Sequence, residues 1–275
     1  MNDRLDAVEA IIAESAPTSV RFVYYRAVSQ GLVPKSNSTG YPQVQRATMK
    51  LRDTGRVPWT AIVDSSRWMR KPRTWLSADD ALHDLTESYR RAMWQDVGTV
   101  VEVWCESESV AGVLWPVCHE LDVPLFPIKG QSSASFAYGA AQSYKAEPKS
   151  VRLIYVGDHD PAGLEIESHL VQKLGRFSGR DDLQLDRLGV TPTHVDDLGL
   201  IGTPAKKAHW IDAAGGRHRF AGQAVEVEAI DAPLLRMMLR EAVEAHLDPH
   251  VLHAHRVFEE SERQGLAAMA AGWSA

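Results

Sequence analysis

The chain has 275 residues, of which 44% are hydrophobic and 24% are charged. These proportions are ordinary for a globular protein with a buried core, and they argue against a disordered chain. No apolar segment approaches the roughly 20 residues that a membrane-spanning helix needs, and the acidic start of the sequence does not resemble a signal peptide. Two cysteines, Cys105 and Cys118, are too few for a disulfide framework. We therefore expect a cytoplasmic protein that is not associated with membranes.

The net charge of −6 conceals an uneven distribution of charge along the chain. Between Ser15 and Leu76 there are eleven Lys and Arg residues and two acids, Asp53 and Asp64, whereas the remainder has 19 basic and 34 acidic residues. Such a basic segment is typical of a protein that binds a polyanion, because Lys and Arg displace counterions from phosphates. A solvated charged face is the alternative, and the ratio of eleven to two disfavours it.

The first 76 residues predict a winged helix-turn-helix domain. Apolar spacing and end signals predict three helices and then a strand. These elements cover residues 3–14, a second helix capped by Thr18 or Ser19 and ended by Gly31, residues 41–54, and residues 57–64. In such a domain the helix after the turn enters the major groove of DNA.

Basic residues gather on the predicted groove-binding helix and behind it. We expect these residues to contact duplex DNA, chiefly its phosphates. They are Arg46, Lys50, Arg52 and Arg56, followed after the predicted wing by Arg67, Arg70, Lys71 and Arg73.

After residue 76 the pattern of predicted secondary structure changes. Residues 77–98 are predicted to link the two parts, mainly as a helix, and residues 99–275 alternate between strands and helices. The predicted strands cover residues 99–105, 123–128, 151–157 and 183–190, and the helices between them cover 108–121, 132–145 and 162–175. A connection at 203–222 then leads to a strand at 225–230 and to helices at 232–247 and 249–270. This alternation predicts an α/β domain with a mostly parallel sheet.

Three acidic residues follow two of these strands. Asp158 and Asp160 come after the strand at 151–157, and Glu106 comes after the strand at 99–105. The carboxyl ends of parallel strands share one edge of a sheet, so we expect the three carboxylates to converge there. Clustered carboxylates repel one another unless a hard cation joins them, and Mg²⁺ prefers oxygen ligands. The sequence therefore predicts a Mg²⁺ site, which Mn²⁺ is also expected to fill.

Two alternatives remain for these acids. Asp158 is also a suitable N-cap for the helix that follows it, a purely structural role. Glu102 and Glu108 compete with Glu106, although Glu102 lies further back in the strand and Glu108 is expected to open the next helix.

A strand-ending Glu106, followed by a strand that ends in the sequence DHDPAG, resembles a Toprim domain, which occurs in topoisomerases, primases and several nucleases. The resemblance covers about residues 99–190 and implies a Rossmann-like fold that binds Mg²⁺. Many members of the family have a Lys directly after the Glu, where this chain has Ser107. The segment PIKG at 127–130 is similar to the second strand of the family, and Lys129 is either a phosphate contact or simply solvated.

The DP-x-G ending is similar to that of topoisomerase VI A subunits and the related meiotic double-strand-break enzyme. In that group an Arg-x-x-Tyr-Tyr motif lies in the winged-helix domain, and its second tyrosine attacks a DNA phosphodiester. The sequence RFVYY at 21–25 resembles this motif, so the resemblance implies that Tyr25 is the nucleophile and Arg21 its cationic neighbour. A nearby cation favours the phenolate of a tyrosine, whose usual pKa is about 10. Tyr24 and Tyr25 as packing residues of a helical core are the alternative.

Eleven histidines raise the question of a zinc site. His246, His250 and His253 share a helix face, but no CxxC pair accompanies them, so no zinc is expected. A phosphate-cradling GxxxxGK[ST] motif is also absent from the sequence, which argues against intrinsic ATP hydrolysis by that device.

These patterns together predict a Mg²⁺-dependent enzyme that binds and cleaves double-stranded DNA. The favoured mechanism is the topoisomerase VI A-like one, through a 5′-phosphotyrosyl intermediate in a homodimer, with a separate ATPase subunit as a further partner. One alternative is a Toprim nuclease that uses activated water. The other is a DNA-binding protein without catalysis.

Overall fold

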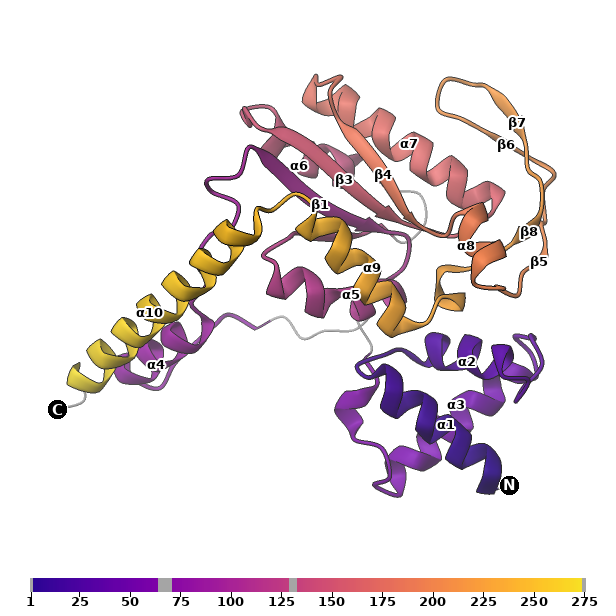
Figure 1. Ribbon diagram of the computed structural model, residues 1–275, viewed down its shortest axis with the longest axis horizontal. Coiled ribbons are helices and arrows are strands. Elements are labelled where there is room, and N and C mark those ends of the chain that lie inside the picture. The colour runs from indigo at the N-terminus through magenta and orange to yellow at the C-terminus, as the bar shows by residue number, and fades with distance from the viewer. Residues whose placement is uncertain (1, 64–70, 129–132, 274–275) are drawn as a thin grey trace.

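The computed structural model describes residues 2–63, 71–128 and 133–273, and its architecture is mixed α/β. A four-stranded parallel sheet lies between helices, and the N-terminal helices form a unit beside it (Figure 1). The strands are β1 (Thr99–Cys105), β2 (Leu125–Pro127), β3 (Ser150–Val156) and β4 (Gln184–Gly189). The helices packed on the sheet are α5 (Glu108–Glu120), α6 (Ala134–Tyr144), α7 (Pro161–Ser178) and α9 (Ala232–Glu244). The predicted alternation of strands and helices is confirmed in this region.

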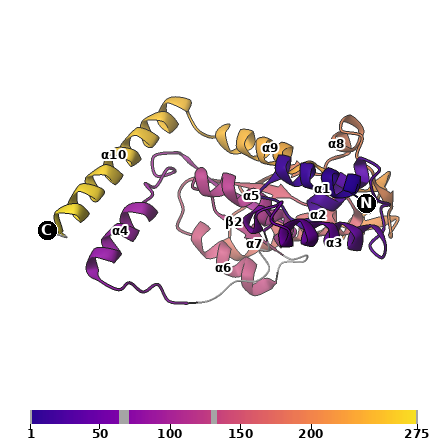
Figure 2. The same ribbon diagram turned by 90° about the horizontal axis from the view of Figure 1, so that it is seen from below.

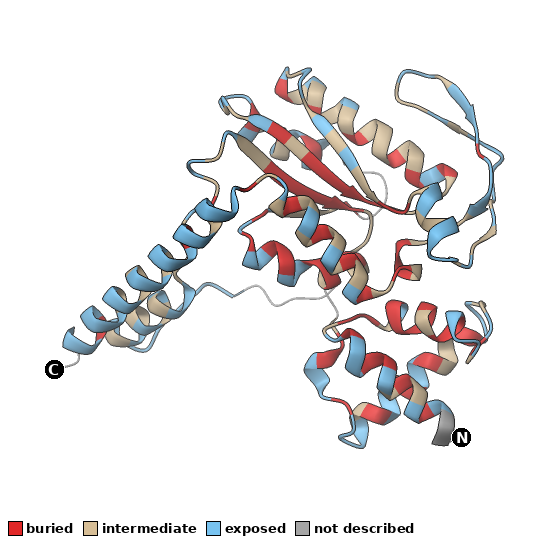
Figure 3. Cartoon of the chain, viewed as in Figure 1, coloured by how far each residue is buried: buried red, intermediate tan, exposed pale blue. Residues whose placement is uncertain are grey.

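The strands of the sheet follow the order β2-β1-β3-β4, and all neighbours are parallel. Side chains of β1 alternate between its faces: Val103 and Cys105 pack with α5 and α9, whereas Trp104 packs with α6 and α7. Both faces are covered, so β1 and β3 are buried along most of their length (Figure 3). All four carboxyl ends lie at one edge of the sheet, where open α/β sheets bind their ligands.

The N-terminal unit consists of α1 (Asn2–Ser15), α2 (Val20–Ser29) and α3 (Gly40–Asp53), which bury a core of their own. The three predicted helices are thus confirmed. Ser19 rather than Thr18 caps α2, since its hydroxyl accepts a hydrogen bond from the backbone N–H of Phe22 at 3.5 Å.

The predicted wing strand at residues 57–64 is wrong in the part that the structure describes. Residues Trp59–Ala61 form a short 3-10 helix, η1, and Ile62 makes an isolated bridge to Thr18. Pro58 has no N–H for a strand ladder, and the adjacent Ala61 and Ile62 are both buried in the helical core instead of alternating across a sheet. A short alternating run does not distinguish a strand from a chain that crosses a helical core.

Helices α4 (Ala78–Ser88) and α10 (Pro249–Trp273) lie side by side and extend away from the sheet (Figure 1, Figure 2). The predicted linking helix over residues 77–98 is too long, because α4 ends at Ser88 and residues 89–98 are not helical. Among the described helices, none is long and apolar enough to cross a membrane.

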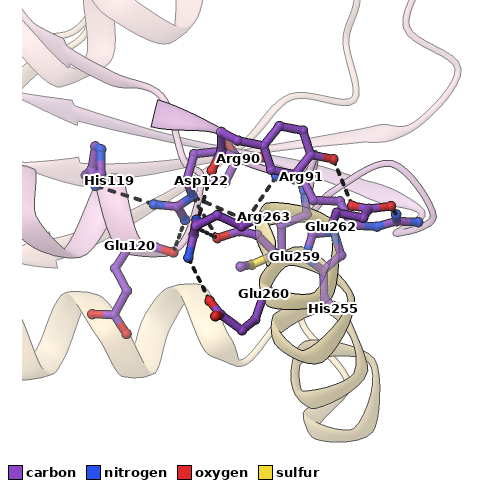
Figure 4. A network of polar contacts seen from close by, with 12 residues as sticks. Arg90, Arg91, His119, Glu120, Asp122, His255, Glu259, Glu260, Glu262 and Arg263 are labelled. Carbon is purple, nitrogen blue, oxygen red and sulfur yellow. Dashed lines mark hydrogen bonds and ion pairs between the residues drawn. The ribbon is translucent and has the colours of Figure 1, made fainter. Parts of the chain in front are cut away.

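Ion pairs with α10 explain why the linking helix stops early. Arg90 and Arg91 reach Glu259 and Glu262, with N–O distances of 3.3 and 2.5 Å (Figure 4). The ring of His255 completes this contact by approaching the carbonyl oxygen of Ala92 at 3.0 Å. The chain between α4 and β1 is thereby tied to α10 instead of continuing as a helix.

Between β4 and α9 the chain makes a long excursion from the sheet. It contains α8 (Pro192–Asp197), the antiparallel pair β5 (Thr203–Pro204) and β8 (Gln223–Ala224), the antiparallel pair β6 (His209–Ile211) and β7 (Arg217–Arg219), and the 3-10 helix η2 (Val227–Ala229). The predicted strand at 225–230 is therefore wrong. Its amides have other acceptors: Val225 bridges to His159, and the N–H of Val227 donates to a carboxylate oxygen of Asp158 at 2.9 Å.

The central strand offers a test of the core. Leu153 of β3 is fully buried, so Leu153→Ala should lower the free energy of unfolding by about 2–5 kcal/mol through lost burial and a residual cavity. Urea denaturation followed by circular dichroism measures this change. Leu76, which is fully exposed, is the matched control, and Leu76→Ala should change stability by less than about 0.5 kcal/mol. Equal effects of the two substitutions would contradict the described packing.

Candidate active site

Two of the predicted acids lie side by side at the carboxyl edge of the sheet. Cys105 and Val156, the last residues of β1 and β3, are paired in register, so the residues that follow them are neighbours. The backbone N–H of Glu106 donates to the carbonyl oxygen of Val156 at 3.0 Å. In return, the N–H of Asp158 donates to the Oε2 atom of Glu106 at 3.1 Å. Direct contacts therefore join Glu106 and Asp158, which the sequence predicted to lie close together.

Asp160 has a different place. It is the N-cap of α7, where its Oδ1 atom accepts a hydrogen bond from the N–H of Gly163 at 2.7 Å. Capping, which the sequence suggested as the alternative for Asp158, thus belongs to Asp160. The Asp158 carboxylate turns instead toward Val227 of η2.

The competing glutamates have separate roles. Glu102 is buried inside the sheet layer and accepts hydrogen bonds from the Trp104 ring nitrogen at 3.1 Å and from the Tyr144 hydroxyl. Glu108 begins α5, as expected, behind the capping hydroxyl of Ser107. Ser107 therefore performs a structural task at the position where the resembled family often has Lys.

A cavity of about 370 Å³ opens beside these acids. Its wall includes the acidic residues Glu106, Glu108, Asp158 and Glu228, together with Arg21 of α2. The side chain of Glu228 is 3% exposed, and its Oε1 atom lies 3.1 Å from Nε of Arg21. Analysis of the sequence missed Glu228 because the segment around it was interpreted as an ordinary strand. The available signal was an acid within an apolar run, which is costly to bury without a partner.

The carboxylates make the cavity strongly acidic. Burial raises the pKa of Asp158 well above its usual value, and the neighbouring carboxylates of Glu106 and Glu228 raise it further. Burial also raises the pKa of Glu106, against the hydrogen bond from the N–H of Asp158. Arg21 supplies the positive charge at this wall.

Three ion pairs hold the N-terminal unit against this region, and all join α2 or its following loop to residues around η2. They join side chains that are far apart in the sequence. Three basic residues of the N-terminal segment therefore form contacts within the chain. The pairs are Arg21–Glu228 at 3.1 Å, Arg26–Asp231 at 2.8 Å and Lys35–Glu226 at 3.2 Å.

The side chains at this site determine whether a cation can bind there. Within the described residues, no group of three or more His, Cys, Asp or Glu side chains is arranged to hold a metal ion as it stands. Glu106, Asp158 and Asp160 each direct one oxygen to a backbone N–H. Each carboxylate has a second oxygen, and partly buried carboxylate oxygens suit a hard cation such as Mg²⁺. Cys105 and Cys118 are free and buried, away from this donor set.

Tyr25 lies on α2 one turn from Arg21, but it faces another cavity, of about 140 Å³, lined by residues near Leu198 and Ile230. The tyrosine is buried, and its hydroxyl hydrogen-bonds with Glu226. Burial and the Glu226 carboxylate raise the pKa of Tyr25, and Arg21 offsets this only in part. The balance in this structure is therefore opposite to the expected activation of a phenolate.

The predicted DNA contacts fall into three groups. Arg46 and Lys50 are exposed on α3, and Lys71 is exposed after the gap in the described chain. Arg70 and Lys129 lie outside the described residues, as does Arg67. The others have partners within the chain: Arg52 stacks over Trp59 at 4.0 Å, Arg56 pairs with Asp6 and Glu9, and Arg73 pairs with Asp84.

Comparison with known proteins adds no relative: no family model, no curated protein and no solved structure matches the chain.

The acidic cavity predicts a dependence of stability on pH. A carboxyl whose pKa is raised by folding binds its proton more tightly in the folded state, so stability is lost as pH rises from the unfolded pKa, near 3.9, through the folded one. Asp158→Asn removes this loss and keeps an oxygen for the Val227 N–H. In EDTA at pH 7.5 we expect a higher Tm by a few degrees, where ~1 kcal/mol corresponds to ~2–4 °C.

Calorimetric melts between pH 4.5 and pH 8 measure this effect, and the gain should shrink toward the acidic end. Asp181→Asn, at an exposed position, is the control and should show no such trend. A lower Tm of Asp158→Asn at every pH would contradict the proposed repulsion.

Proposed function

We propose that this protein is a metal-dependent enzyme that cleaves DNA, with a Toprim-type active site at the carboxyl edge of its sheet. The observation that carries the proposal is the shared cavity of Glu106, Asp158 and Glu228, where Arg21 is the one cation among the described lining residues. A site this acidic repels a phosphodiester unless a cation joins them, so the substrate and the metal are expected to bind together.

A divalent cation, when bound, would neutralise phosphate charge and activate water for attack on phosphorus. Asp158 and Glu228 are the residues expected to hold it, with Glu106 beside them. Asp160, which the sequence predicted as a ligand, caps α7 and is not among the residues that line the cavity. Burial raises the pKa of Glu106, which makes this side chain a stronger proton acceptor than an ordinary glutamate. Arg21, half-exposed at the cavity wall, is placed to contact a non-bridging phosphate oxygen. Hydrolysis consumes one water and breaks one P–O ester bond.

DNA is the substrate that the surrounding charge favours. The exposed Arg46 and Lys50 of α3 belong to the same N-terminal unit as Arg21. The proposal takes these exposed cations as contacts for the phosphate backbone, since Lys and Arg gain affinity for DNA by releasing counterions.

Transesterification through Tyr25 is the second candidate. The observation in its favour is the position of Tyr25 one turn from Arg21 on α2. Its burial and raised pKa favour a structural role within a single chain, so this candidate needs movement of α2 or a second copy of the chain. A homodimer and a separate ATPase subunit belong to this second candidate.

Cleavage of supercoiled plasmid tests the acidic site. With Mg²⁺ or Mn²⁺, Glu106→Gln should lower the rate by about 10²- to 10⁴-fold, the usual cost of losing a proton acceptor. Glu87→Gln, at an exposed position on α4, is the matched control and should retain wild-type activity. Absence of cutting by the wild-type protein under both metals, together with binding in gel shifts, would instead support the non-catalytic DNA binder.

Tyr25→Phe separates the two mechanisms. If water is the nucleophile, the variant should cut DNA within about threefold of wild type, with stability lowered by about 1 kcal/mol for the lost hydrogen bond. The measurement is plasmid cutting followed by denaturing gels with and without protease, which reveal protein covalently joined to DNA ends. Protein–DNA adducts in wild type that disappear in Tyr25→Phe would establish transesterification and reject hydrolysis.

A further inference from the structure

A basic hairpin lies beside the acidic site and has no part in the proposed chemistry. Strands β6 and β7 form it, and the two residues Lys206 and Lys207 lead into it. In the acidic remainder of the chain, residues 206–219 contain four Lys and Arg residues and one acid, Asp212. Figure 1 shows the hairpin beside α7, near the carboxyl ends of the strands, whereas α2 lies on the other side of the sheet, with α5 and α9.

The cations of β7 share one face of the hairpin. Arg217 and Arg219 are two residues apart in a strand, so their side chains point the same way, and both are exposed. His218, between them, points to the opposite face and stacks on Trp210 with ring centroids 4.4 Å apart. In the described part of the chain, no carboxylate pairs with either arginine, in contrast to Arg56 and Arg73 of the N-terminal segment.

The hairpin is held in a defined shape. At its turn, the Oδ1 atom of Asp212 accepts hydrogen bonds from the N–H groups of Ala214 and Gly216 at 2.9 and 2.8 Å. Gly215 has φ of +89°, and a Cβ on Gly216 would lie 2.5 Å from Asp212, so this turn requires glycine.

Contacts with α7 fix the position of the hairpin. The N–H of Ile211 donates to Glu165, and the N–H of Ala213 donates to the hydroxyl of Ser168, at 3.1 and 2.9 Å. The side chain of Gln172 donates to the carbonyl oxygen of Ala213 at 2.7 Å. The arginines are therefore displayed on a supported strand.

The base of the hairpin is joined directly to the acidic loop. Phe220, the residue after Arg219, is buried, and its ring lies 5.0 Å from that of His159, between the two acids of the DHD sequence. Val225 and His159 exchange two backbone hydrogen bonds, of 2.8 and 3.0 Å. Arg219 is therefore adjacent in sequence to Phe220, which contacts the loop that carries Asp158 and Asp160.

We propose that Arg217 and Arg219 form a second DNA-contacting surface, which binds the phosphate backbone next to the cleavage site. The inference rests on the proposed function, since it takes DNA as the ligand. Two exposed arginines that pair with no carboxylate in the described chain favour an anionic ligand, and the proposed function supplies one, the phosphate backbone of DNA.

The test is DNA binding by the full-length protein, measured as fluorescence anisotropy of a labelled 30-bp duplex in EDTA between 50 and 200 mM salt. Arg217→Gln with Arg219→Gln should weaken binding about tenfold and reduce the slope of log K against log salt by about 2, one unit for each lost phosphate contact. Lys145→Gln with Arg176→Gln is the matched control, because both residues are exposed cations near the opposite, amino edge of the sheet. The control should match wild type within about twofold.

Thermal melts verify that both double variants fold. Wild-type affinity and salt slope in the Arg217/Arg219 variant would overturn the inference while leaving the proposed function intact, and so would an equal loss in the control variant. Failure of the wild-type protein to bind duplex DNA at any salt concentration would overturn the proposed function, and the hairpin surface with it.

Discussion

Repulsion between buried carboxylates is the constraint on which the rest of this structure depends. Glu106 and Asp158 follow adjacent parallel strands, so the topology of the sheet forces them together. Backbone amides satisfy one oxygen of each, but an amide carries no net charge to balance them. Burial raises the pKa of both residues, and the neighbouring carboxylates raise it further. A fold that only needed stability would place apolar residues here, and carboxyl groups with perturbed pKa values are frequent in functional sites.

The positive charge that offsets these carboxylates comes from a part of the chain that is distant in sequence. Arg21 reaches Glu228 from α2, and Lys35 reaches Glu226 from the loop that follows it. These contacts make the N-terminal helices part of the acidic site and not merely a neighbouring unit. They also account for part of the excess positive charge of the N-terminal segment, for which the sequence suggested a polyanion partner or, as the alternative, a solvated charged face.

Sequence patterns were reliable where a single element determined the outcome. Strands buried on both faces and helices with clear ends were predicted close to their observed bounds, and the adjacency of Glu106 and Asp158 followed from parallel topology. The predictions were wrong where contacts between residues far apart in the sequence determine the local structure. The segment at 57–64 alternates like a strand but packs on a helical core, and the segment at 225–230 gives the N–H of Val227 to Asp158 instead of to a strand. Glu228 was missed for the same reason, because its partner, Arg21, lies about 200 residues away in the sequence.

The placement of cations around the cavity follows from the same repulsion. A phosphodiester brought to this edge meets an acidic wall, so attraction has to come from positive groups set beside the wall and not within it. The exposed cations of α3 and the arginines of β7 satisfy that condition, since they lie on separately supported elements near the acids without pairing with them. Arg21 is the exception, because it pairs with Glu228 and its charge would be divided between that ion pair and the proposed substrate. A cation bound among the carboxylates would compete with Arg21 for Glu228, and that competition couples occupancy of the site to the contact between the sheet and the N-terminal helices.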